Sequence, residues 1–426
     1  MPIAHRSILV SLMPSLCLLW PAAARPADEP TYTNLYAFSI ANYANGLYPQ
    51  GNLAIDGNGV LYGTTQLGGA YNQCDGGSDE GCGTVYSLTP PASPGGSWTE
   101  TVLWSFGGTP ADAANPFGVA MGSGGVLYGA AGGGAGCGGT IFSLTPPGGT
   151  GGAWTEAVIY QFNCAPDGEE PNSGLVIDAN GVLYGTTVEG GTGACSTFGC
   201  GTVFSLAPPA GPGRNWTETV LWSFGGNGDG TNPRAGLEIG TGGVLYGVTP
   251  DGGAGGDGVA FSLAPPENSG GAWTETVLYN FPASARQHPV ILALGEGGLL
   301  YGTTYLLKGR DQGGTAFSLS PPPGGPWTET TITRFPARGP DAHTSDKPNG
   351  PLILDGKTGA LFGATGIGSH GVGTVFELLP PKPGGNAWKK RLLDNSHTLS
   401  PTLGLRSRGV LYGTDFVNNT VWSLVP

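Results

Sequence analysis

The chain has 426 residues, a net charge of -13 and only 17 lysines and arginines. This is too few cations to neutralise a phosphate backbone or an anionic membrane surface, which argues against nucleic acid and lipid headgroups as main partners. Calcium, neutral glycans and protein surfaces remain compatible. Gly 80 and Pro 37 would suggest disorder in an aperiodic chain, but here they separate short apolar runs and serve as turn residues.

Residues 1–24 have the features of a secretory signal peptide. His5 and Arg6 precede an apolar stretch from Ile8 to Trp20, and alanines lead up to Ala24. No second apolar stretch is long enough to span a membrane. We therefore expect cleavage after about Ala24, removal of Cys17 with the signal, and an exported monomer whose residues 25–426 form one domain without a membrane span.

The rest of the chain repeats one unit, seen most plainly from Pro171 to Phe224. The unit holds four apolar runs separated by Gly, Pro, Asn or Asp, and such runs are typical of β-strands joined by turns. The runs are Gly174 to Asp178, Val182 to Thr187, Thr202 to Leu206, and Trp216 to Phe224. Consecutive apolar residues in the second run predict strands covered on both faces, with Gly185 allowing close approach of a neighbouring sheet.

The runs recur in different numbers along the chain. The second run, G-V-L-Y-G, has seven copies at intervals of 50 to 66 residues, and the third, G-T-V-F-S-L, also has seven. The fourth run has six, which begin at Trp98, Trp154, Trp216, Trp273, Trp327 and Trp388. A seventh, TYTNLYAF, lies at the other end of the chain, from Thr31 to Phe38.

Seven quartets, with the last one completed by an N-terminal strand, predict a closed ring. The expected fold is all-β: a seven-bladed β-propeller of four-stranded antiparallel blades. A parallel β-helix would have shorter coils, and separate sandwich domains would need roughly 100 residues each. The repeated tryptophans are then expected to pack between blades. Trp104 and Trp222 interrupt a column of mostly Tyr, and they are the candidates for more exposed rings.

Two resemblances support this interpretation. The pattern P-x-x-G-L-x-I-D-x-x-G-V-L-Y is similar to that of NHL-type propellers, whose matching segments form the two inner strands. The motifs G-V-L-Y-G-T-T, G-T-V-F-S-L and W-T-E-T-V-L-W-S-F, with echoes over residues 31–424, resemble the tandem-repeat proteins called GloVer-containing, or choice-of-anchor, proteins. The resemblance implies an exported repeat protein and leaves its activity open. Members often end in a surface anchor, whereas this sequence ends at Pro426, so release is expected here.

Six cysteines remain after removal of the signal, an even number that predicts disulfides in an exported chain. Six cysteines permit fifteen pairings, and position in the unit narrows them. In two of the pairs, both cysteines lie in the same loop between a second and a third strand. In the remaining pair, one cysteine opens a third strand and the other follows the fourth strand of the same unit, so both lie at the same end of neighbouring strands. The predicted pairs are Cys74 with Cys82, Cys137 with Cys164, and Cys195 with Cys200. A metal or redox site is disfavoured because no C-x-x-C is present.

Four histidines are predicted to occupy loops on one face of the ring. His288, His343 and His397 follow fourth strands, and His370 lies between a second and a third strand, with Asp341 and Asp346 nearby. His with carboxylate would suit zinc, or an acid and base pair. The alternative is that polar loops hold histidine by chance, since neither H-x-x-x-H nor H-E-x-x-H occurs.

No linear sequence motif indicates a particular reaction or cofactor. The acidic segments at 167–171, 229–233 and 346–348 lack the spacing of a calcium loop, so turn formation is favoured over calcium binding. A G-x-S-x-G elbow, a phosphate loop and a dinucleotide fingerprint are absent. The sequence therefore leaves two functions open: a secreted scaffold that binds an extracellular glycan or protein, and an extracellular polysaccharide hydrolase or lyase.

Overall fold

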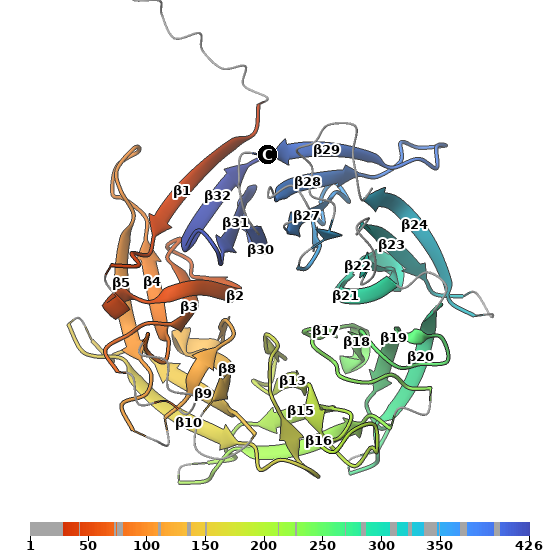
Figure 1. The fold of residues 1–426 in the computed structure, drawn as a ribbon, viewed down its shortest axis with the longest axis horizontal. Helices are drawn as coiled ribbons and strands as arrows, with labels where there is room; N and C mark the ends of the chain where they lie inside the picture. The colour runs from red at the N-terminus through yellow and green to blue at the C-terminus, as the bar shows by residue number, and fades with distance from the viewer. Residues whose placement is uncertain are drawn as a thin grey trace, which may run out of the picture.

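The computed structural model describes residues 29–41, 43–71, 74, 80–109, 112–133, 138–149, 151–211, 213–225, 228–268, 270–282, 287–306, 313–322, 326–335, 347–348, 350–366, 373–395 and 401–426. These residues form seven antiparallel sheets arranged as blades around a central axis (Figure 1). The predicted all-β, seven-bladed propeller is confirmed. The short 3-10 turns are η1 (Tyr43–Asn45), η2 (Ser123–Gly125), η3 (Thr241–Gly243) and η4 (Glu296–Gly298).

Each blade runs from an inner strand at the axis to an outer strand at the rim (Figure 1). Blade 1 contains β2 (Leu47–Ile55), β3 (Leu61–Leu67), β4 (Thr84–Thr89) and β5 (Thr99–Ser105). Blade 2 contains β6 (Ala114–Pro116), β7 (Ala120–Met121), β8 (Leu127–Gly133), β9 (Thr140–Thr145) and β10 (Thr155–Gln161). Blade 3 contains β12 (Val176–Ile177), β13 (Leu183–Thr187), β15 (Thr202–Ala207) and β16 (Thr217–Ser223). A separate pair, β11 (Gly168–Glu169) and β14 (Glu189–Gly190), joins two loops beside it.

The remaining blades follow in the same order. Blade 4 contains β17 (Glu238–Ile239), β18 (Leu245–Thr249), β19 (Gly256–Ala264) and β20 (Thr274–Pro282). Blade 5 contains β21 (Gln287–Leu294), β22 (Leu300–Leu306), β23 (Gly314–Ser320) and β24 (Thr328–Phe335). Blade 6 contains β25 (Lys347–Pro348), β26 (Ile353–Leu354), β27 (Leu361–Gly366), β28 (Thr374–Leu379) and β29 (Lys389–Asp394). Blade 7 contains β30 (Pro401–Ser407), β31 (Val410–Asp415), β32 (Thr420–Val425) and, from the other end of the chain, β1 (Thr31–Ala37).

The ring closes through the N-terminal strand. β1 pairs antiparallel with β32, and the register runs from Thr31 opposite Val425 to Ala37 opposite Thr420. One residue further on, the backbone N–H of Phe38 donates a hydrogen bond to the carbonyl of Asn419 over 2.8 Å. The first strand and the last one therefore share a sheet, as the copy numbers of the runs predict.

Aromatic rings fill the interfaces between consecutive blades. In blade 3 the Phe204 ring meets Phe162 of blade 2 edge-on, with centroids 5.1 Å apart. The same edge-on contact recurs as Phe38–Tyr86, Phe106–Phe142, Phe224–Phe261 and Phe281–Phe317, and Phe335–Phe376 makes a tilted contact at the next interface. Edge-to-face pairs of this kind add to the burial of large apolar areas. They explain why the second and third strands are buried on both faces.

The reason for the glycine after the repeated Tyr differs from the sequence expectation. A Cβ added at Gly185 would lie 2.6 Å from the ring of Phe204, its cross-strand partner in the same blade. The glycine makes room for that ring to lie across its own sheet and reach blade 2, so the expectation of direct approach by a neighbouring blade was wrong.

The six repeated tryptophans pack between blades as predicted. Trp154, just before β10 of blade 2, lies 6.1 Å from the ring of Tyr62 in blade 1. Trp216 makes the equivalent contact with Tyr128 at 5.6 Å.

In the described part of the chain, no helix is long and apolar enough to cross a membrane.

Candidate binding site in the groove between blades 1 and 2

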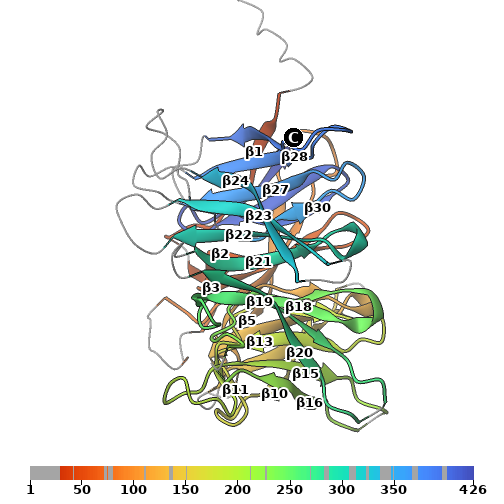
Figure 2. The same ribbon diagram turned by 90° about the vertical axis from the view of Figure 1, so that its right-hand side faces the viewer.

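Two kinds of loop emerge on the same face of the ring, which we call the long-loop face. They connect second to third strands within a blade and outer strands to the next blade's inner strand, and they project to one side in Figure 2. Antiparallel alternation of four strands requires this arrangement. All four histidines were expected on this face from the sequence.

His288 is a buried part of the sheet, and the expectation that it occupies a loop was wrong. It lies in β21 with 7% of its surface exposed. Its Nδ1 is 2.6 Å from the carbonyl oxygen of Pro250 and 3.5 Å from Oδ1 of Asp251, and its ring stacks on Tyr305 at 5.5 Å. The Nδ1–H therefore donates to a backbone carbonyl, which is a typical role of a satisfied core histidine.

The other predicted ligand residues, His343, His370, His397, Asp341 and Asp346, lie outside the described residues. Their convergence on one site stays a prediction. Within the described ranges, no three His, Cys, Asp or Glu side chains are arranged to hold a metal ion. The acidic turns are engaged in local hydrogen bonds: Asp167 accepts from the Tyr160 hydroxyl over 2.9 Å and from backbone amides, and Asp229 accepts from the amide of Gly225 over 2.9 Å.

Two of the predicted disulfides are present on the long-loop face. Cys74 bonds to Cys82 with a Cα–Cα distance of 5.7 Å, and Cys195 bonds to Cys200 with 5.3 Å. Cys164 is disulfide-bonded as well. Its predicted partner, Cys137, lies outside the described residues, so that pairing stays a prediction.

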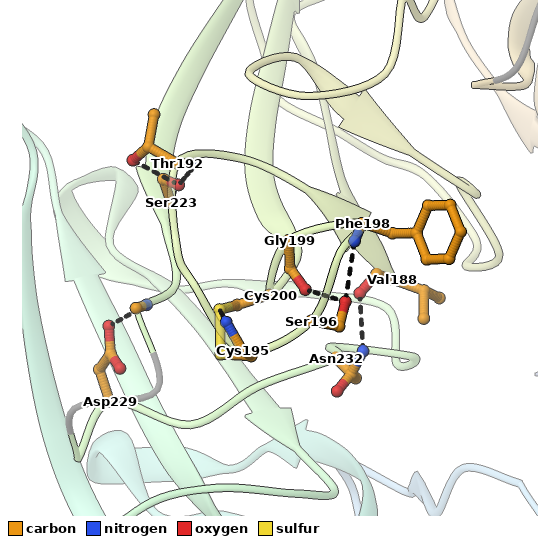
Figure 3. The surroundings of a disulfide bond; sticks show 11 residues. Val188, Thr192, Cys195, Ser196, Phe198, Gly199, Cys200, Ser223, Asp229 and Asn232 are labelled. Carbon is orange, nitrogen blue, oxygen red and sulfur yellow. Dashed lines mark hydrogen bonds between the residues drawn. A yellow bond between two sulfur atoms is a disulfide. The ribbon is translucent and has the colours of Figure 1, made fainter.

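The second disulfide holds a tight turn with an exposed aromatic ring. Figure 3 shows Phe198 projecting from the loop closed by Cys195 and Cys200, and 55% of its surface is exposed. The Ser196 hydroxyl accepts from the amide of Phe198 over 3.0 Å and donates to the carbonyl of Gly199 over 3.0 Å. The turn is thereby fixed on both sides of the ring.

The first disulfide lies beside a cavity of about 750 Å³ between the outer strands of blades 1 and 2. One wall comes from β5, including Trp104, and the other from β10, including Glu156. Tyr71 and Asp112 line it from the two kinds of loop on the long-loop face. We call this cavity the rim groove. Its size falls within the range of about 300–1,000 Å³ that is usual for small-ligand sites.

Tyr71 is positioned by backbone contacts and by the disulfide. A Cβ built on Gly108 would lie 3.4 Å from the Tyr71 ring, so the ring stands over that glycine, with 49% of its surface exposed. A Cβ on the neighbouring Gly107 would collide with Sγ of Cys82. Because Cys82 is fully buried, the disulfide anchors both the loop that carries Tyr71 and the loop beneath it.

Two carboxyl-bearing residues, Asp112 and Glu156, line the rim groove and interact electrostatically. Burial, reinforced by the charge of Asp112, raises the pKa of Glu156 to about 7. Burial also raises the pKa of Asp112, while backbone amides oppose that shift, among them the amide of Gly108 that donates to it over 3.1 Å. Oε1 of Glu156 is buried without a hydrogen-bond partner among the described residues. The groove thus brings an exposed aromatic ring together with two carboxyl groups of raised pKa.

The same pairing of a loop aspartate with an outer-strand glutamate recurs between the next two pairs of blades. Between blades 2 and 3, Tyr160 and Asp167 lie with Glu218, and burial with the Asp167 charge raises the pKa of Glu218 to about 7. Between blades 3 and 4, burial and the charge of Asp229 raise the pKa of Glu275 to about 7 as well. The glutamates all occupy the third position of the W-T-E run, and each loop aspartate stands four residues before a turn proline. This set was not predicted from the sequence, although both signals are visible in the repeat.

The fold and the groove together define a tandem-repeat β-propeller with a ligand-sized concavity on its rim. The family model of the Gloeobacter/Verrucomicrobia repeat matches residues 26–237 and 190–421. The chain therefore belongs to the Gloeobacter/Verrucomicrobia repeat family, in agreement with the resemblance noted from its motifs.

Similar solved structures share the fold. Hydrazine synthase of Kuenenia stuttgartiensis has 13% identity and a TM-score of 0.52, and the match covers 89% of this chain and 96% of that chain. PorZ of Porphyromonas gingivalis, described as a surface component of the type-IX secretion system, has 14% identity and a TM-score of 0.50 over 89% of this chain. The match spans 46% of the PorZ chain. No match was found among curated proteins.

Proposed function

We propose that this protein is a secreted binding scaffold whose ligand is a neutral glycan held in the rim groove. The observation that carries the proposal is the combination in one cavity of an exposed Tyr71 ring, the Trp104 wall and the carboxyl-bearing residues Asp112 and Glu156. Pyranose rings present apolar faces that suit aromatic side chains and hydroxyl groups that donate to carboxylates. The net charge of -13 favours a neutral ligand over a polyanion.

A glycan fits the site better than the other binding partner that the sequence left open, a protein. Stable protein interfaces bury roughly 800 Å² on each partner, whereas a concave groove of this volume suits part of a small or linear ligand. The disulfides beneath Tyr71 and beside Phe198 support an oxidising, extracytoplasmic location, and they limit the conformational entropy lost on binding. Cleavage of residues 1–24 and a monomeric state are parts of the same proposal.

A polysaccharide hydrolase or lyase is the second candidate, because Asp112 and Glu156 are titratable groups with raised pKa values in one cavity. Paired carboxyl groups are the usual acid and base of glycoside hydrolysis. However, the pair recurs between two further pairs of blades. Recurrence is expected of a structural or binding feature of the repeat, whereas catalysis needs one site, so we favour binding.

The test is a glycan array followed by calorimetry on the glycans retained. Tyr71→Ala should weaken binding about tenfold, as expected for the loss of roughly 1.4 kcal/mol of stacking. Tyr43→Ala is the matched control, because Tyr43 is an exposed tyrosine in η1, 44% exposed, that does not line the groove. No glycan retained, or equal affinity of the two variants, would overturn the proposal. A parallel screen for released reducing ends, abolished by Glu156→Gln, would establish the enzyme instead.

A further inference from the structure

A second cavity of about 660 Å³ lies on the axis of the ring. All seven inner strands contribute to its wall, and Figure 1 shows them converging around the centre. Most of the side chains that line it are apolar, among them Leu53, Val119, Leu175 and Leu352. We call it the axial cavity. It shares no lining residue with the rim groove, so a ligand on the axis would be independent of the proposed glycan site.

One carboxyl group interrupts this apolar wall. Glu238 in β17 lies opposite Tyr246 of the next strand. Five other blades place a small or aliphatic residue at the same register position, opposite the aromatic residue of the second strand. These residues are Ala54, Ala120, Val176, Ala293 and Ile353. The carboxyl group is therefore a departure from the repeat, confined to one blade, and packing of the ring does not require it.

The carboxyl group of Glu238 has no compensating partner among the described residues. Burial alone raises its pKa to about 7, without a contribution from a hydrogen bond or a neighbouring charge. The cation on the same wall is Arg406, and its guanidinium lies 3.0 Å from Oδ1 of Asp355 and over the Phe362 ring at 5.1 Å. Arg406 is thus engaged by blade 6. An ionised carboxylate in an apolar cavity is costly unless it is paired.

We propose that the axial cavity binds a small organic cation, a protonated amine carried on an apolar body, whose ammonium group pairs with the Glu238 carboxylate. The ammonium supplies the counter-charge that the wall lacks, and the apolar body covers the leucine and valine side chains. The cavity volume is in the usual range for such ligands. A neutral alcohol of the same length would fill the same space without the charge, and this provides the comparison for the test.

Binding should be linked to proton release. Because burial raises the pKa of the carboxyl group to about 7 and the bound ammonium favours its ionised form, binding at pH 7 should release protons. Affinity should rise from pH 6 to pH 8. Two elements pack on β17. From β18, Tyr246 lies beside Glu238, and in β21 the titratable residue His288 lies at the far end of the strand from Ala293, where its ring is hydrogen-bonded to the carbonyl of Pro250. Across the cavity stands the paired Arg406.

The experiment is isothermal titration of the full mature protein with hexylammonium and with hexanol. Hexylammonium should bind saturably, hexanol at least about tenfold more weakly, and Glu238→Gln should remove this difference. Glu267→Gln is the control, since Glu267 is exposed and lies outside the cavity. Equal binding of the amine and the alcohol to the wild type, or an unchanged amine affinity in Glu238→Gln, would overturn the proposal. If the variant fails to fold, the comparison of hexylammonium with hexanol on the wild type decides, because equal binding of the two overturns the proposal.

Discussion

Replacement of Phe38 by alanine tests whether the N-terminal strand is an integral part of the ring. Phe38 follows β1, is 4% exposed, and packs edge-on against Tyr86 of blade 1 with centroids 5.0 Å apart. Phe162 makes the equivalent contact between blades 2 and 3 at 5.1 Å, within a continuous stretch of chain. The two rings differ mainly in that Phe38 reaches its interface from the opposite end of the sequence.

The expected magnitude follows from the loss of a buried aromatic ring. Deletion of a buried Phe side chain costs about 3–5 kcal/mol through lost transfer energy and the cavity left behind. Phe38→Ala and Phe162→Ala should therefore lower the free energy of unfolding by similar amounts. Ile40→Ala is the control, because Ile40 lies just beyond the same strand with 68% of its surface exposed, and it should change stability by less than about 0.5 kcal/mol.

The assay is urea unfolding under non-reducing conditions, followed by far-UV circular dichroism and tryptophan fluorescence. The slope of the free energy against urea should be alike in all variants, so that shifts in midpoint report stability. If Phe38→Ala behaved like Ile40→Ala while Phe162→Ala lost several kcal/mol, the N-terminal strand would not carry the closure of the ring.

Three further predictions use the same unfolding assay. The double replacement of Cys195 and Cys200 by serine should lower the free energy of unfolding by about 2 kcal/mol, since the disulfide closes a short loop with a sequence separation of 5. An unchanged free energy of unfolding would show that the disulfide does not stabilise the fold. The free energy of unfolding should fall between pH 6 and pH 8, because Glu156, Glu218, Glu238 and Glu275 have pKa values of about 7 in the folded protein, well above those of the unfolded chain. Their contribution to stability is complete below the unfolded pKa and is lost as the pH rises through about 7. A midpoint that rises over this range would refute the assignment. His288→Ala should cost about 1–3 kcal/mol by leaving the Pro250 carbonyl without its donor, and added zinc should shift wild type and variant equally; a zinc-dependent gain in the wild type alone would restore a metal role.

Much of the fold could be predicted because the repeat is visible seven times. In the third unit the predicted runs 182–187, 202–206 and 216–224 correspond to β13, β15 and β16 within about one residue at most boundaries. The first run was overestimated: β12 has two residues, which pair with Tyr184 and Leu183 of the next strand. The number of copies of each run was enough to indicate ring closure. The last unit lacks its fourth strand, and the seventh copy of that run lies at the N-terminus, so the seventh blade is complete only if the two ends of the chain share a sheet.

The rim groove could not be predicted, because its parts belong to different blades. Asp112 and Glu156 are far apart in sequence, and nothing in either segment indicates that an outer strand of one blade faces the loop of another. His288 shows the converse: its position after a fourth strand suggested a loop, but it pairs with Tyr305 in the sheet, and its ring contacts the carbonyl of Pro250 in the preceding blade. Such contacts depend on how blades turn relative to one another.

The sequence by itself determined the local elements: the alternation of apolar runs and turns, the number of blades and the cysteine pairs within single loops, since each depends on residues close together in the chain. Only the tertiary structure decided which side chains share a cavity. Glu238 lies among apolar residues, and Tyr71 stands over Gly108, because seven sheets pack face to face around one axis. Burial and pKa follow from that packing, and a linear pattern does not contain it.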